Sequence, residues 1–118
     1  MSFAETEAVD SDRIQWPAFV AVPQAKVLSG APETSTHVLR DTPKAQMGLW
    51  RVTPGAFSTD HAGYVEFVHI IGGSGRLVSE HGAVTELRAG STALLPEGWR
   101  GRWEIDATLT KSFTIIRD

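Results

Sequence analysis

Glycine or proline follows nearly every short apolar segment of this chain from Gln46 onward. PG ends the first such segment, GGSG the second, and HG, AG and PEG separate those that come after. Glycine adopts turn conformations that other residues avoid, and proline cannot donate a hydrogen bond inside a sheet. Between these breaks the chain is rich in valine, isoleucine and threonine, which favour strands. The pattern therefore predicts an all-β fold of many short strands joined by tight turns.

The spacing of these breaks also predicts how the chain is organised. No window has the period of an amphipathic helix, so we expect an antiparallel sandwich or barrel. Residues 14–44 carry four of the six prolines and should form edge strands or covering segments. Residues 1–13 are acidic and should form a flexible N-terminal arm, leaving 14–118 as one domain. The strands expected in the tighter region are 47–53, 64–71, 75–80, 83–87, 92–95, 101–105 and 109–116.

Composition excludes several classes of protein. A chain of 118 residues is long enough for one domain only. The absence of cysteine excludes disulfides, thiolate metal sites and cysteine nucleophiles. A net charge of −3 disfavours binding to nucleic acid, which usually requires a basic surface. The sequence contains no membrane-spanning apolar run and starts with no secretory signal, so we expect a cytoplasmic protein that does not bind membranes.

The segment 64–71 carries one residue that does not fit its surroundings. By alternation, one face of this strand holds Tyr64, Glu66 and two aliphatic residues, and the other holds Phe67, His69 and two more. Both faces are mostly apolar, so we expect the strand to be covered on both sides. Glu66 should then be ion-paired, metal-bound or protonated, because a buried carboxylate is otherwise costly. His69 should point away from Glu66 and be hydrogen-bonded in the sheet or at a subunit contact.

Longer phrases in the same region resemble a known family. The spacings G-x5-H, E-x6-G and G-x5-P-x-G resemble the two motifs of the cupin superfamily. GLWRVTPGAF, YVEFVHIIGGSGRL, ELRAGSTALLPEGWRGRW and the late Lys111 resemble its ureidoglycine-aminohydrolase-type branch, over roughly residues 48–116. The resemblance implies a single-domain cupin, which is a double-stranded β-helix or jelly-roll barrel. Glycines such as Gly73, Gly90 and Gly98 would permit its tight connections.

Metal-binding cupins hold their ion with three histidines and a glutamate, and the resemblance assigns these positions one by one. His61 matches the first histidine and Glu66 matches the glutamate, although the two are one residue closer than usual. The other two histidine positions hold Gly63 and Gly101. At most two of the four ligands remain, and two ligands seldom hold a divalent ion tightly. We therefore predict no metal ion and no other cofactor.

Two further residues share the inward parity of their strands. Trp103 lies two residues after Gly101, so its indole is either an ordinary core side chain or a stacking wall for a ligand, with Glu66 as a possible acceptor for its N–H. Lys111 alternates with Leu109 and Phe113. It either extends to solvent from a strand end or forms a buried pair with Glu66.

These residues leave several functions open. We expect a pocket in the barrel, lined by Tyr64, Glu66, Trp103 and Lys111 with His61 at its mouth, that binds a small polar or planar metabolite. The alternative is an enzyme, aminohydrolase- or isomerase-like, with Glu66 as base or metal ligand. A third possibility is a solidly packed barrel that acts through a dimer or partner surface. In each case we expect a homodimer.

Overall fold

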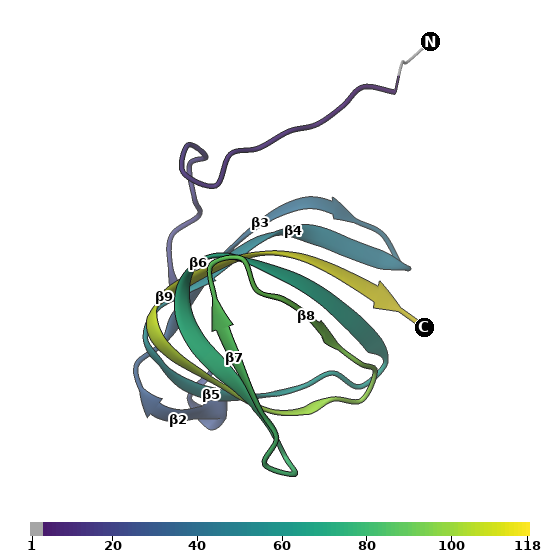
Figure 1. Ribbon diagram of the computed structural model, residues 1–118. Helices are drawn as coiled ribbons and strands as arrows, with labels where there is room; N and C mark the ends of the chain where they lie inside the picture. The colour runs from purple at the N-terminus through teal and green to yellow at the C-terminus, as the bar shows by residue number, and fades with distance from the viewer. Residues whose placement is uncertain (1–3) are drawn as a thin grey trace.

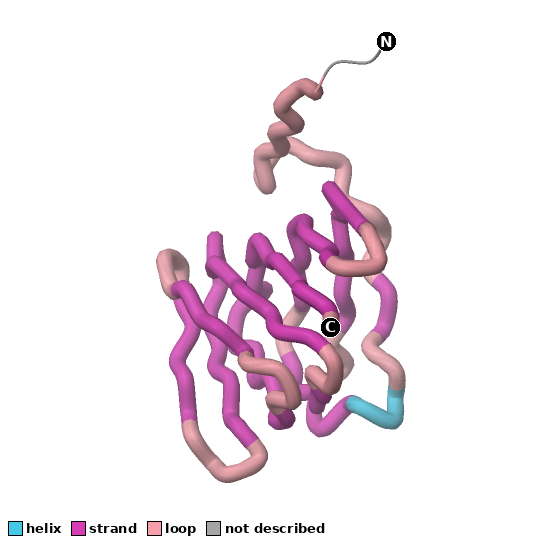
Figure 2. The backbone as a smooth tube through the Cα atoms, turned by 90° about the vertical axis from the view of Figure 1, so that its right-hand side faces the viewer, coloured by secondary structure: helices cyan, strands magenta, loops and turns pink. Residues whose placement is uncertain are grey.

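The computed structural model describes residues 4–118 and is built almost wholly of strands (Figures 1 and 2). The helical content of these residues is a single 3-10 turn, η1 (Gln24–Lys26), and none of their helices could span a bilayer. The strands are β1 (Val20–Ala21), β2 (Val27–Gly30), β3 (Glu33–Asp41), β4 (Ala45–Val52), β5 (Gly55–Asp60), β6 (Tyr64–Ser79), β7 (Val84–Arg88), β8 (Thr92–Leu95) and β9 (Arg100–Arg117). The predicted all-β class is confirmed.

Two long strands organise the sheet. β6 and β9 pair antiparallel from Tyr64↔Arg117 to Ser79↔Gly101, so they run together through the whole domain. The first half of β6 also pairs with β8 and the second half with β7, while β9 pairs with β5 and then with β4. The sheet therefore curls into two facing layers, β1-β3-β4-β9-β6-β8 and β2-β5-β9-β6-β7, which share β6 and β9. This is the expected jelly roll (Figure 1).

β6 combines two of the expected strands because its glycines form a bulge rather than a loop. The register against β9 shifts between Ile70 and Gly75, and Gly73 lies within this shift with a φ of 83°. A Cβ atom on Gly73 would stand 2.1 Å from the carbonyl oxygen of Thr108. Only glycine fits this conformation and this spacing. The strand therefore bends from one layer into the other without ending.

The N-terminal part of the chain covers the outer face of β3 and β4. The Arg51 guanidinium lies between the rings of Trp16 and Phe19, at 4.6 and 4.5 Å from their centroids. The Ser35 hydroxyl donates to the Pro17 carbonyl over 2.6 Å. β1 and β2 then pair at the edges of the sheet, as the prolines predicted. Within the predicted arm, residues 1–3 lie outside the described residues, and residues 4–13 contain no strand.

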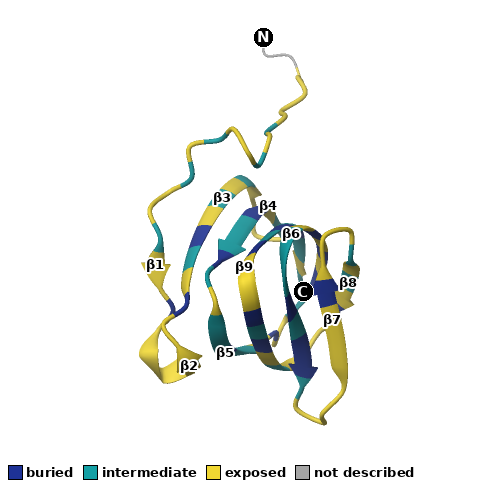
Figure 3. Cartoon of the chain, turned by 60° about the vertical axis from the view of Figure 1, so that its left-hand side comes forward, coloured by how far each residue is buried: buried dark blue, intermediate teal, exposed yellow. Residues whose placement is uncertain are grey.

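The core lies between the two layers, where the buried residues of the strands gather (Figure 3). The outer face of β6 carries exposed residues. Val52, Ile70 and Leu109 are completely buried at its centre. On the opposite face of β6, Phe67 is 45% exposed and His69 is exposed as well. The expectation that 64–71 is covered on both sides is therefore wrong for the single chain, because no segment of residues 4–118 crosses that face. His69 does make the expected hydrogen bond, to the Thr92 hydroxyl at 3.2 Å.

The bulge predicts a difference between two glycines that both have positive φ. Gly82, in the β6–β7 turn, has a φ of 90° but open space around its missing side chain. Gly82→Ala should cost only the backbone strain, about 1–2 kcal/mol. Gly73→Ala adds a collision with the β9 backbone and should cost clearly more. Urea unfolding of the two variants measures this, and equal losses would contradict the bulge geometry.

Candidate functional site

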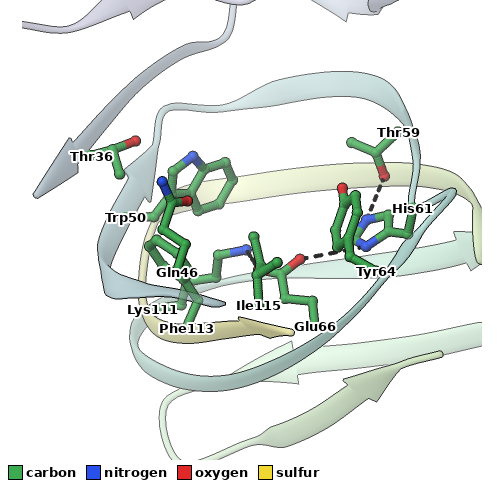
Figure 4. A pocket seen from close by; sticks show the side chains of 10 residues that line it. All are labelled: Thr36, Gln46, Trp50, Thr59, His61, Tyr64, Glu66, Lys111, Phe113 and Ile115. Carbon is green, nitrogen blue, oxygen red and sulfur yellow. Dashed lines mark hydrogen bonds and ion pairs between the residues drawn. The ribbon is translucent and has the colours of Figure 1, made fainter. Parts of the chain in front are cut away.

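A pocket of about 280 Å³ opens between the layers at the end of the barrel where β4, β6 and the last part of β9 meet (Figure 4). Its size is near the lower end of the range for small-molecule sites. Inward alternation along three neighbouring strands supplies most of the wall. The lining residues are Thr36, Gln46, Trp50, Thr59, His61, Tyr64, Glu66, Lys111, Phe113 and Ile115. Four of the five residues predicted for the site are among them.

The base of the pocket holds a buried ion pair. Lys111 Nζ donates to Glu66 Oε2 over 2.7 Å, and each residue is only 5% exposed. Glu66 therefore has a partner, as expected for a buried carboxylate on this face of the strand. It also excludes the alternative in which Lys111 extends to solvent. Burial lowers the pKa of Lys111, while the charge of Glu66 opposes that shift.

The ammonium of Lys111 also contacts aromatic rings. Its Nζ lies 4.3 Å from the ring centroid of Trp50 and 4.4 Å from that of Trp103. Such cation–π contacts partly replace the water that a buried ammonium has lost. The negative faces of two indoles and one carboxylate therefore hold this positive charge inside the barrel.

His61 is buried against the other side of Glu66, not exposed at the pocket mouth as expected. The residue is 2% exposed. It lies in the β5–β6 turn, where its backbone N–H donates to the Trp99 carbonyl. The ring Nε2 is 3.3 Å from the Thr59 hydroxyl. Nδ1 lies 3.7 Å from Glu66 Oε1, too far for a good hydrogen bond, and has no other partner among the described residues.

Burial sets the protonation of the aromatic residues beside Glu66. It lowers the pKa of His61 from 6.5, aided by the charge of Lys111 and opposed by those of Glu66 and Asp60. Burial also raises the pKa of Tyr64 from 10.0, and the negative charges of Glu66 and Asp60 raise it further. The Tyr64 and His61 rings pack with centroids 4.8 Å apart. At neutral pH both side chains are therefore uncharged.

Trp103 belongs to the core behind the pocket, which corrects its expected place in the wall. Its indole is 2% exposed and stacks on Phe57 at 6.4 Å between centroids. It makes no hydrogen bond to Glu66, whose Oε2 is taken by Lys111. Trp50, which neighbours Trp103 at 5.5 Å, provides the flat wall instead.

The positions of the two missing histidines do not fit a metal site. At Gly101 a Cβ atom would stand 2.2 Å from the Val78 carbonyl oxygen and 2.7 Å from the indole of Trp99. Gly63 has a φ of 86° in the turn before β6, which disfavours a side chain there. No three His, Asp or Glu side chains in residues 4–118 lie close enough to share an ion. The cation beside Glu66 is the ammonium of Lys111.

Trp99 is the functional neighbour that the sequence analysis missed. Its ring meets the His61 ring edge-on, at 5.5 Å and 87°, and its side chain lies over Gly101. It therefore packs between the imidazole and the position that the cupin resemblance assigns to a further ligand. The signal for it was a tryptophan two residues before a glycine that stands at a ligand position.

A jelly roll with an interior pocket built on these motifs defines the class of protein as a cupin. Within that class the chain belongs to the family of the EutQ-like cupin domain, whose family model matches residues 39–113. None of the curated proteins is a significant match.

Solved structures of low identity share the fold. EutQ of Clostridium difficile superposes with a TM-score of 0.65 at 15% identity, over 73% of this chain and 64% of that chain. A protein of unknown function from Pseudomonas syringae pv. tomato superposes with a TM-score of 0.76 at 20% identity, over 89% of this chain and 46% of that chain. A predicted oxalate decarboxylase of Thermotoga maritima superposes with a TM-score of 0.69 at 19% identity, over 95% of this chain and 100% of that chain. The chain thus spans less than two thirds of the first two proteins.

The ion pair predicts an asymmetry between single and double substitution. Lys111→Met leaves Glu66 as a buried carboxylate without a partner and should cost about 3–5 kcal/mol of unfolding free energy. Combining it with Glu66→Gln removes both charges and should restore most of that loss. Lys44→Met, the same change at an exposed lysine, should alter stability by less than about 0.5 kcal/mol. Urea unfolding compares the three variants, and equal stability of Lys111→Met and Lys44→Met would exclude a buried pair.

His61 predicts a pH dependence. Its pKa is lowered in the folded state, so the unfolded chain binds a proton first as pH falls. Stability should therefore decrease below about pH 6.5, until the pH reaches the lowered pKa of the folded form. NMR titration should show a His61 pKa below 6.5. His61→Asn should remove this part of the decrease, and a His61 pKa at or above 6.5 would contradict the prediction.

Proposed function

We propose that this cupin binds a small polar or planar metabolite in its pocket and does so without a metal ion. One observation carries the proposal. His61 lines the pocket, and its Nδ1 is enclosed beside Glu66 with no hydrogen-bond partner among the described residues. Buried polar atoms in folded proteins are almost always hydrogen-bonded, so an unpaired atom at the wall of a pocket supports a site that an ordered water or a ligand completes.

The remaining side chains suit the same role. The Trp50 indole offers a flat wall, and Tyr64 and Gln46 offer polar groups near the opening. Lys111 has three N–H donors, of which one goes to Glu66. Fixed polar groups on a rigid barrel favour binding because little order is lost when a ligand arrives. A sensor, an accessory subunit or a binding module would use such a pocket.

A catalytic role is the second candidate. Glu66 Oε1 faces the pocket beside the neutral imidazole of His61, an arrangement that supports proton transfer on a bound molecule. Isomerisation by Glu66 as base would use the site as it stands. The ureidoglycine-aminohydrolase-type resemblance implies aminohydrolase chemistry, which needs a water activated by a metal ion. No three metal-ligating side chains of residues 4–118 lie close enough together to bind such an ion. Membership of that branch stays a proposal.

The quaternary state and location also stay proposals. A homodimer is supported by exposed apolar side chains on the outer face of the sheet, Phe67, Leu94 and Ile116. The third candidate function, action through such a surface, would rest on the same residues. A cytoplasmic location is supported by the sequence alone.

Pocket occupancy can be tested by NMR with a panel of amino acids, hydroxy acids, amides and sugars. At least one member should shift the backbone resonances of the pocket strands in a saturable way. Ile115→Trp fills the opening and should abolish these shifts, while Ile116→Trp places the same side chain on the exposed outer face and should not. Shifts that survive Ile115→Trp would mean that ligands bind elsewhere.

Elemental analysis of protein purified without chelators is the control for the metal-free part. Transition metal should be far below one ion per chain. Stoichiometric metal that Glu66→Gln removes would overturn this part of the proposal and favour the enzyme.

A further inference from the structure

The charges around the pocket balance one another. Of the ten residues that line it, Glu66 and Lys111 form a buried ion pair of opposite charges. His61 and Tyr64 are neutral because burial disfavours their charged forms. The other six are polar, aromatic or aliphatic residues without charge. Asp60, which precedes His61 in the chain, is exposed and paired with Arg100 at 3.1 Å. The lining as a whole is therefore electrically neutral.

A neutral pocket of this kind is poorly suited to an ion. A ligand carboxylate could bind the remaining N–H groups of Lys111, but it would place two buried carboxylates around a single ammonium. A ligand cation would face Glu66 but also the ammonium 2.7 Å away. In either case one unpaired charge stays in a desolvated place, which is costly. An uncharged ligand avoids this cost.

The free polar atoms define what an uncharged ligand must offer. Glu66 Oε1 and His61 Nδ1 face each other at 3.7 Å. The His61 ring can carry its proton on either nitrogen and its Nδ1 is enclosed, but Glu66 Oε1 is an acceptor in both tautomers. One N–H or O–H of a ligand would pair with that oxygen. Beside it, Lys111 keeps N–H groups that can donate to a carbonyl oxygen.

We propose that the pocket selects a small uncharged molecule with an N–H or O–H donor next to a carbonyl oxygen. The donor binds Glu66 Oε1, the carbonyl oxygen binds Lys111 Nζ, and the planar carbonyl group lies along the Trp50 indole. This inference rests on the proposed function, of which it specifies the ligand class. Hydroxyamides, hydroxyketones and simple amides belong to that class, and carboxylates do not.

Lactamide and lactate provide a direct test because they share a skeleton and differ in charge. NMR titration of the wild-type protein at neutral pH gives both dissociation constants. Lactamide should bind at the pocket about ten-fold more tightly than lactate or better, because lactate must also bury an uncompensated charge. Lactate binding that is equal or tighter, or lactamide binding that is undetectable, overturns the inference.

Glu66→Gln provides a second measurement that a merely structural role would not predict. It leaves Lys111 as the only charge in the lining, so the preference should move toward lactate. Glu33→Gln, the same change at an exposed residue, should keep the wild-type preference. If Glu66→Gln does not fold, the wild-type ratio alone decides. A charged metabolite that binds the wild type but not Ile115→Trp would overturn this inference and leave the proposed function standing.

Discussion

The whole domain depends on the pairing of β6 with β9. These two strands stay hydrogen-bonded from Tyr64↔Arg117 to Ser79↔Gly101, and each carries further strands on its other edge. Both layers are therefore extensions of one ladder, and the interior between them is fixed by how that ladder bends. Glu66 and Lys111 come from its two strands, and both point into the interior. The buried ion pair is thus held by the most highly connected part of the backbone.

The glycines and prolines at turns made most of the strands predictable. The details of strand pairing, such as the bulge in β6, were not predictable from the sequence. Strand 92–95 was predicted with its observed bounds. The glycine and proline spacing predicted an antiparallel sandwich or barrel, and the cupin resemblance implied the jelly roll. The GGSG run was read as a break, yet it is a bulge inside β6. Sequence distinguishes these poorly because glycine permits both, and the outcome depends on the β9 backbone that lies against Gly73. The open outer face of β6 likewise depends on which segments cross it.

For the site, strand alternation predicted which side chains point inward but not how far each one lies from the pocket. Alternation placed Glu66, Lys111 and Trp103 inward, and the structure agrees with all three. Their distances from the pocket differ because β9 crosses from one layer to the other, so that Trp103 lies in the core while Lys111 reaches the cavity. Trp50 was within a predicted strand and could have been found by the same alternation. Trp99 could not, since it lies in a turn, where side-chain direction has no period.

The packing of Trp99 over Gly101 bears on whether this barrel could acquire a metal centre. A histidine at 101 would collide with the indole, and its Cβ would also collide with the Val78 carbonyl oxygen 2.2 Å away. A smaller side chain at position 99 would remove the first collision but not the second, which involves the backbone of Val78. A histidine at this position would therefore require β6 and β9 to move apart at the Ser79↔Gly101 end of their ladder. Point substitutions in the lining are not enough to place a metal ligand there.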